Sequence, residues 1–291
     1  MNLCIIGPEK RSKSDIELVE KGNKYFDSVL YVPIQNIRVE AINEKPTPFF
    51  KGTDLTKFDV VLPRFDTDYA GFSYVLMKIF EEYGVLSPIS SVSTTYAYNE
   101  FLTPLFLKEE GIPTPNIYFS ISRQSLENKI SSLKYPVLLR LPYHKKGEMV
   151  LKSENSLKGV IDTMQRLAQP IMIEENYKNP IPMKILVIGP DTYAVKGDGE
   201  TYSLSSGEHQ IILRSTRLLN TLICQVNAVK VSGELQIKNL ELYPDIVEFG
   251  SLFKKDLIGS VLKYLSEASK YSKGKDVIGR FLDWFRESRW N

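Results

Sequence analysis

The first ninety residues alternate between two patterns: short apolar runs, and stretches with apolar residues at helical spacing. The runs have the length of buried strands, and the stretches have the period of a helix with one buried face. Strands that alternate with helices indicate a parallel sheet with helices packed on it. The expected strands are 3–6, 28–32 and 58–63, with a hairpin at 49–54, and the expected helices are 15–25 and 71–83.

A second part begins after Ser87–Ser93, a segment rich in serine and proline that we interpret as a linker. Strands become dense after Pro170, which favours an antiparallel sheet. The chain therefore divides into three parts, 1–90, 91–169 and 170–291. In the second part we expect helices at 98–110, 125–133 and 156–167 and strands at 117–120, 135–141 and 149–151. In the third we expect strands at 170–175, 183–188, 192–195, 211–213, 228–231 and 236–242 and helices at 256–269 and 276–287.

The charged residues nearly cancel, since 37 Lys and Arg against 35 Asp and Glu leave a net charge of +2. Proteins that grip nucleic-acid phosphates usually have a larger positive excess, so we do not expect a nucleic-acid partner. No run reaches 18 apolar residues, and we expect neither a membrane span nor a signal peptide. Cys4 and Cys224 lie far apart in apolar runs, without a disulfide or metal pattern, which predicts a cytoplasmic protein.

Three motifs occur in an order that resembles one family. Residues 51–64 read KGTDLTKFDVVLPR, residues 101–115 read FLTPLFLKEEGIPTP, and residues 135–140 read YPVLLR. They are similar to the KG…L…FD-x-V-(I/L)-P-R, L…L…GIPTP and (Y/F)P-(V/L)-V-x-K stretches of the RimK-type amino-acid ligases of the ATP-grasp superfamily. Each motif alone is common, whereas their order and spacing are specific. Shorter matches follow at 170–175, 186–189 and 239–241.

This resemblance, over about residues 1–265, implies an α/β, three-lobed ATP-grasp fold. An N-terminal parallel α/β pre-ATP-grasp domain would precede two α+β lobes that hold a nucleotide cleft between them. Members of the family use ATP and Mg²⁺ to activate a carboxylate as an acyl phosphate, which an amine then attacks to form an amide. The implied partners are a nucleotide and an amino-acid, peptide or protein substrate.

The resemblance assigns Arg140 to a position where the family has a lysine that reaches the nucleotide phosphates. Arginine keeps the positive charge and changes the geometry, and a solvated arginine at a strand end is the alternative. The family's earlier lysine falls at Glu100, where a carboxylate would repel a triphosphate. A shifted register would bring in Lys108 instead.

The loop 142–149 replaces a G-S-x-G-x-G stretch of the family. Glycines there let backbone N–H groups surround a phosphate and let the loop close over it. Of these glycines, Gly147 remains. Lys145 and Lys146 either supply side-chain charge to the phosphates in their place or solvate an exposed turn.

Three further residues align with family positions. Glu174 and Glu175 fall in the hinge beside adenine and ribose, where Glu175 would accept from ribose hydroxyls. A solvated pair of acids is the alternative. Lys184 aligns with a family arginine that grips an acidic substrate or the transferred phosphoryl group, and a plain surface lysine is the alternative.

Glu241 keeps the first carboxylate of the family's E-x-N metal motif, but Tyr243 replaces its asparagine. The carboxylate expected about a dozen residues earlier falls at Val229. Mg²⁺ usually takes one or two carboxylates besides phosphate and water, so Glu241 alone makes a poor site. Asp245 and Glu248 are the other carboxylates nearby.

Two interpretations stay open. The chain is an ATP-dependent carboxylate–amine ligase with a divergent site, or it is a catalytically inactive protein that binds a nucleotide or another anion and acts through partners. RNA contact through Lys145, Lys146, Lys152 and Arg140 is a weaker third interpretation, because the net charge is small. The apolar residues of 277–285 would serve a core or a contact between copies of the chain.

Overall fold

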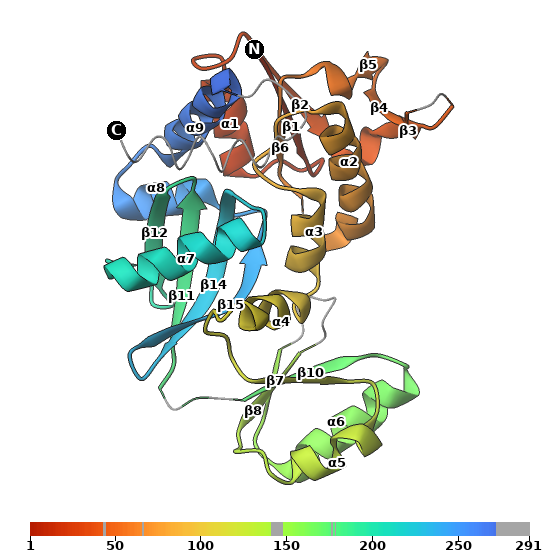
Figure 1. Cartoon of the computed structure of the whole chain (residues 1–291), viewed down its shortest axis with the longest axis vertical. Helices are drawn as coiled ribbons and strands as arrows, with labels where there is room; N and C mark the ends of the chain where they lie inside the picture. Colours follow the sequence, from red (N-terminus) through yellow and green to blue (C-terminus); the bar gives the residue numbers. More distant parts are fainter. Residues whose placement is uncertain (43–44, 66, 141–147, 176, 178, 272–291) are drawn as a thin grey trace. The chain divides into compact units, whose positions relative to one another are not determined.

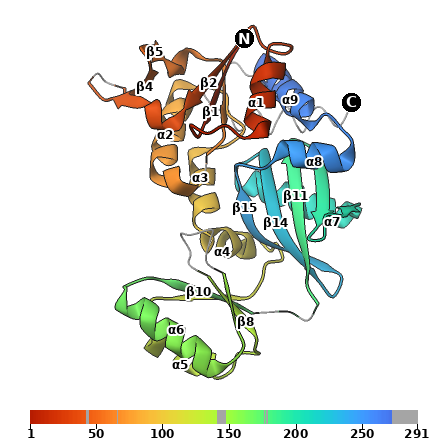
Figure 2. The same cartoon turned by 180° about the vertical axis from the view of Figure 1, so that it is seen from behind.

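The computed structural model describes residues 1–42, 45–65, 67–140, 148–175, 177 and 179–271 (Figures 1 and 2). The chain forms two compact units, and each is described by itself. Unit 1 comprises Met1–Ala97, Met183–Val226 and Leu240–Asn291, and unit 2 comprises Tyr98–Pro182 and Asn227–Asn239. The division into three lobes at residues 90 and 170 stays a prediction.

Unit 1 begins with the expected parallel sheet. Its strands are β1 (Asn2–Gly7), β2 (Ser28–Pro33) and β6 (Val60–Pro63), in the order β2-β1-β6. The helices α1 (Lys13–Gly22) and α2 (Ala70–Tyr83) follow β1 and β6, and α9 (Leu257–Tyr271) lies against α1 (Figure 1). Gly84 ends α2 in the left-handed region at φ 70°, where glycine is unstrained. The prediction of alternating strands and helices is confirmed.

A small antiparallel sheet branches from this part of the chain. It consists of β3 (Arg38–Glu40), β4 (Thr47–Phe50) and β5 (Thr53–Asp54), and 3-10 turns lie at Ile34–Asn36, Leu55–Lys57 and Thr67–Tyr69. Phe50 pairs with Thr53 across the turn Lys51-Gly52. The hairpin expected at 49–54 is therefore confirmed.

The segment interpreted as a linker is instead buried in unit 1. Ser90 and Ser93 share a hydrogen bond of 2.7 Å, and the Ser93 hydroxyl also donates to the Leu219 carbonyl at 2.8 Å. The helix α3 (Ser91–Tyr98) begins within this segment, before α4 (Leu102–Glu109). The linker prediction is wrong because hydroxyls that pair with each other and with backbone carbonyls are readily buried.

Unit 2 contains a four-stranded antiparallel sheet with two helices on one face. The order is β7-β10-β8-β9, with β7 (Ile117–Ser120), β8 (Val137–Arg140), β9 (Met149–Leu151) and β10 (Ile171–Glu175). The helices are α5 (Arg123–Ile130) and α6 (Glu154–Arg166). Alternate residues of β8 and β10, such as Leu139 and Ile173, pack on these helices. The strand expected to open the third part, β10, thus pairs with β7 and β8.

The remaining sheet has five strands in the order β13-β12-β11-β14-β15. They are β11 (Ile181–Ile188), β12 (Asp191–Lys196), β13 (Thr201–Tyr202), β14 (Ile223–Val231) and β15 (Glu234–Glu241), with α7 (Ser206–Leu218) and α8 (Ile246–Phe253). β14 and β15 each run from one unit into the other. The antiparallel pairing of β11 with β12 and of β12 with β13 agrees with the expectation from strand density.

The strand predicted at 211–213 is wrong, because these residues lie within α7. Ser205 caps this helix, and Glu208 reaches back to the Ser205 backbone, which is the reciprocal capping box. The pattern Ser-x-x-Glu ahead of an apolar run was the signal for a helix. The second expected terminal helix, at 276–287, lies outside the described residues. Among the residues that are described, no helix is both long and apolar enough to cross a membrane.

Candidate nucleotide and metal site

Arg140 ends strand β8 of unit 2 and is 7% exposed. The pairing of β8 with β10 places Arg140 opposite Met172 and Leu138 opposite Glu174. These four side chains share the face of the sheet that α5 and α6 do not cover, because neighbouring residues in a strand alternate between faces. The alternation therefore brings the Arg140 guanidinium and the Glu174 carboxylate to the same side.

Three carboxylates surround the Arg140 guanidinium. Its Nη1 lies 3.3 Å from Glu100 Oε2, and its Nη2 lies 3.0 Å from Glu148 Oε2 and 3.3 Å from Glu174 Oε2. Glu174, 3% exposed, also pairs with Lys238 of β15 at 2.9 Å. These five side chains carry two formal positive and three formal negative charges. Arg140, the residue expected to bind phosphates, is thus paired with Glu100, the carboxylate at the position of the family's other lysine.

One donor of Arg140 remains. Its Nε is buried and has no hydrogen-bond partner among the described residues. A buried donor without an acceptor costs about 1–3 kcal/mol, so an acceptor such as water or an anionic oxygen is expected there. The residues Lys145, Lys146 and Gly147 of the expected phosphate loop lie outside the described residues, and their role stays a prediction.

Glu175 lies at the end of β10 and is held by neutral donors. Tyr118 donates to its Oε1 at 2.8 Å, and Asn116 donates to its Oε2 at 3.1 Å. Burial opposes its ionisation, but these two hydrogen bonds, together with the positive charges of Lys129 and Lys134, lower the pKa of Glu175. The carboxylate is therefore ionised and already has partners, while a contact with ribose stays a prediction.

The two remaining predicted residues belong to unit 1. Lys184 is exposed on β11, opposite Val195 of β12. Glu241, at the end of β15, accepts a hydrogen bond of 3.3 Å from Gln225. The structure does not place either residue relative to Arg140, so their roles at a shared site stay predictions.

Tyr243, at the asparagine position of the expected metal motif, instead contacts Asp15 of helix α1 and Arg64, which follows β6. The Tyr243 hydroxyl donates to Asp15 Oδ2 at 2.6 Å, and the Arg64 guanidinium stacks 4.4 Å from the centre of the Tyr243 ring. Arg64 also donates to Asp15 Oδ1 and to the Pro244 carbonyl, both at 2.9 Å. Arg64 and Asp15 are buried, and sequence reasoning did not single out either one.

The other carboxylates near Glu241 have structural roles as well. Asp245 caps α8, where its Oδ1 accepts from the Glu248 amide at 3.1 Å and from the Ser14 hydroxyl at 3.0 Å. Val229 is buried and offers no ligand atom. In the part of the chain that the structure describes, no three His, Cys, Asp or Glu side chains are grouped so as to hold a metal ion. The described residues therefore do not fit a Mg²⁺–triphosphate site of the expected kind.

Glu148 and Lys238 complete the Arg140 cluster, and sequence reasoning missed both. Glu148 lies near the end of the loop 142–149, which replaces the family's glycine-rich stretch, and Lys238 directly precedes the match at 239–241 without being part of it. The sequence does carry one indication of this cluster. Both positions are lysine in the family pattern, and here one is the acidic Glu100 while the other is the basic Arg140. Two opposite charges at positions that both face one ligand indicate that they pair with each other.

Comparisons with known proteins agree with the fold. The RimK pre-ATP-grasp domain family matches residues 1–94. The probable alpha-L-glutamate ligase of Thioalkalivibrio sulfidiphilus is 19% identical, over 93% of this chain and 97% of its own length. That of Methanococcoides burtonii is 18% identical, over 94% and 98%.

The chain is therefore similar to the RimK-type ATP-grasp proteins, through its first 94 residues and through these relatives over nearly its whole length. A solved structure with the same fold is the ATP-grasp ligase PsnB in complex with the precursor peptide PsnA2 and AMPPNP. It has a TM-score of 0.74 at 12% identity, and the match covers 92% of this chain and 97% of PsnB. The α/β ATP-grasp architecture expected from the motifs is therefore confirmed.

Proposed function

We propose that this protein keeps the architecture of an ATP-dependent carboxylate–amine ligase and functions mainly by binding, with ordinary ligation weak or absent. The observation that carries the proposal is the enclosure of Arg140 by Glu100, Glu148 and Glu174. Acyl-phosphate formation transfers a phosphoryl group whose charge must be met by cations and metal ions. Here the central cation is already neutralised, and the metal motif is incomplete.

Coulomb energies show how strongly the three carboxylates oppose the binding of a triphosphate at Arg140. Two unit charges 4 Å apart interact by about 4 kcal/mol at an effective dielectric constant of 20. A triphosphate that reaches Arg140 must therefore displace carboxylates and approach a cluster whose five formal charges sum to minus one. Removing a single well-placed electrostatic contact from an active site typically costs about 10²–10³ in rate. Several such contacts differ here, so slow or absent turnover follows.

A binding role is supported by the Nε–H of Arg140, which has no acceptor among the described residues and fits one anionic oxygen or a water molecule. A peptide is the class of partner that we favour, because PsnB was solved with its precursor peptide. A cytoplasmic location also remains our prediction, and the two free, buried cysteines agree with it.

The second candidate is an active ligase with a divergent site. The kinship with probable alpha-L-glutamate ligases favours it, since they match over nearly their whole length. In that case the substrate would be an amino acid or a peptide, activated as an acyl phosphate by ATP and Mg²⁺.

The test is the affinity for ATP and ADP, measured by calorimetry on the wild type and on Glu100→Lys. If the carboxylate at position 100 blocks the phosphates, Glu100→Lys raises the affinity about tenfold or more, which is about 1.4 kcal/mol. Glu109→Lys is the matched control, because Glu109 is exposed on α4 in the same unit and undergoes the same change of charge. Tight ATP binding by the wild type, with amide formation, would establish the ligase instead.

A further inference from the structure

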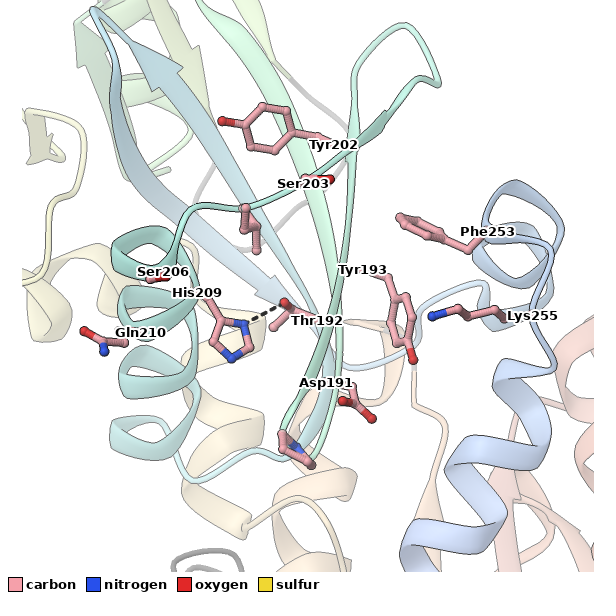
Figure 3. A pocket seen from close by; sticks show the side chains of 12 residues that line it. Asp191, Thr192, Tyr193, Tyr202, Ser203, Ser206, His209, Gln210, Phe253 and Lys255 are labelled. Carbon is pink, nitrogen blue, oxygen red and sulfur yellow. Dashed lines mark hydrogen bonds between the residues drawn. The ribbon is translucent and has the colours of Figure 1, made fainter. Parts of the chain in front are cut away.

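A groove lies at one edge of the five-stranded sheet in unit 1 (Figure 3). Its volume is about 540 Å³. It is lined by the start of β12, the residues after β13, the first half of α7 and the end of α8 with the turn that follows. The residues used below are Thr192, Tyr193, Ser206, His209, Gln210 and Lys255.

The strand register leaves part of β12 beyond the end of its neighbour. β12 pairs with β11 along its whole length, from Asp191 to Lys196. On its other side β13 pairs with Ala194 and Val195, and β13 ends at Tyr202. The part of β12 that carries Thr192 therefore extends past this pairing and forms an edge of the sheet.

The backbone of Thr192 has the right direction to pair with a further strand. The Lys196 amide donates to the Glu200 carbonyl at 2.8 Å, so position 196 presents its backbone groups to the β13 side. Successive residues of a strand present them to opposite sides. Positions 194 and 192 therefore share that direction, and the N–H and C=O of Thr192 face the groove edge.

Two different walls flank this edge. The Thr192 hydroxyl shares a hydrogen bond of 2.9 Å with Nδ1 of His209, which places the α7 wall, with Ser206 and Gln210, on one side (Figure 3). The Tyr193 ring meets the Phe253 ring edge-on at 5.3 Å on the other side. One wall is therefore polar, and the opposite wall is aromatic.

The aromatic wall also carries a cation. The Lys255 ammonium lies 5.4 Å from the centre of the Tyr193 ring, and its side chain is exposed. Asp191, also exposed, is the first residue of β12. Lys255 is the lysine that lines the groove, so an anionic group on this wall would pair with Lys255 and avoid Asp191.

We propose that this groove binds an extended peptide, which pairs with Thr192 as an added strand and directs an acidic side chain to Lys255. Side chains of an extended peptide alternate between two faces, which matches a polar wall opposite an aromatic and cationic wall. Strand addition of this kind takes affinity from main-chain hydrogen bonds and specificity from alternate side chains. The inference goes beyond the proposed function, because it needs no nucleotide and stands or falls separately from events at Arg140.

The probe is a capped pentapeptide, Thr-Val-Thr-Glu-Thr, added without nucleotide to ¹⁵N-labelled protein. We expect the Thr192 amide signal to shift and its hydrogen exchange to slow in proportion to occupancy. The matched probe has the same sequence with its central amide N-methylated, which removes one main-chain donor. Binding at least tenfold weaker for the N-methylated peptide supports strand pairing, and equal affinity overturns it.

The proposed pairing of Lys255 with the acidic side chain of the peptide is tested with Lys255→Glu. We expect the affinity for the pentapeptide to fall at least fivefold, and exchange of the glutamate for glutamine in the peptide to remove the difference between variant and wild type. Lys254→Glu is the control, because Lys254 is the neighbouring exposed lysine and does not line the groove. Equal losses for both variants, or no shift at Thr192 at millimolar peptide, would reject the site.

Discussion

The Tyr243 hydroxyl donates a 2.6 Å hydrogen bond to Asp15, a residue 228 positions earlier in the chain. Tyr243 occupies the asparagine position of the metal motif, yet its ring packs under Arg64 and its hydroxyl faces the N-terminal helix α1. Where the family pattern has a metal-binding asparagine, this chain therefore has a tyrosine that connects the segment after β15 with helix α1. The replacement strengthens a buried polar cluster in unit 1.

We expect Tyr243→Phe to lower the free energy of unfolding by about 1–3 kcal/mol, because the buried Asp15 carboxylate loses one of its donors. Denaturation by urea at pH 7 measures this. Tyr74→Phe is the control, since Tyr74 is 42% exposed on α2 and should change stability by less than about 0.5 kcal/mol. Equal stability of Tyr243→Phe and wild type would mean that water replaces the hydroxyl.

Asp15→Asn should cost more, about 3–5 kcal/mol, because it leaves the buried Arg64 guanidinium without its ion-pair partner. The loss should depend on pH. Burial opposes ionisation of Asp15, but Arg64 and the Tyr243 hydroxyl outweigh burial and lower the pKa of Asp15 below its usual 3.8. A lowered pKa means that the native state gains stability at pH values above 3.8 and loses it as the pH falls through the native pKa.

The difference in unfolding free energy between wild type and Asp15→Asn should therefore be constant from about pH 5 to 7 and shrink below pH 3.8. Urea denaturation at several pH values provides the curve. A difference that instead grows on acidification would contradict the assignment of Asp15 as the ionised partner of Arg64.

Mg²⁺ should bind weakly to this protein. We expect 5 mM MgCl₂ to change the thermal midpoint by less than about 1 °C, because a ligand stabilises only when its concentration exceeds its dissociation constant. ADP release with amino acids or short acidic peptides should stay at background with Mg²⁺ or Mn²⁺. Robust release that Glu241→Ala abolishes would show a working metal site at Glu241, and Gln225→Ala would then separate a ligand role from a hydrogen-bond role.

The thiol of Cys224 should resist alkylation in the native protein. Burial raises the pKa of Cys224 to about 12. At pH 8 about one thiol in 10⁴ is then ionised, and the thiolate is the reactive form. Labelling by iodoacetamide should therefore follow unfolding in a urea series. Rapid labelling in native buffer would show that the strand β14 opens locally.

Patterns of local periodicity predicted most of the fold. The apolar runs of β1, β2 and β6 mark a buried parallel sheet, and Gly84 marks the end of α2. Local patterns failed where tertiary packing decides. The serines at 90 and 93 are polar in sequence but buried with each other, and the run at 211–213 is apolar but helical because Ser205 and Glu208 cap its start.

The candidate site was predicted less well, because ion pairs join residues whose distance in sequence gives no signal. The motifs relate both Glu100 and Arg140 to a phosphate, whereas in the structure the two side chains pair with each other. Lys238 lies 64 residues after Glu174 and outside the match at 239–241, so no spacing rule links the two residues. The motif identifies the position of Tyr243, whereas its contact with Asp15 depends on how the segment after β15 packs against α1.

The chain crosses between the two units between residues 97 and 98, 182 and 183, 226 and 227, and 239 and 240. On the ribosome, unit 2 thus lacks its last segment until residue 239 has been made, including Lys238 and the Ile237 amide that donates to the Pro113 carbonyl. The core of unit 1 is likewise incomplete until α9 has been made and covers α1. Domains usually fold in turn as they emerge during synthesis. This nascent polypeptide must instead leave the core of unit 2 unfinished until residue 239 has been made and the core of unit 1 unfinished until α9 has been made.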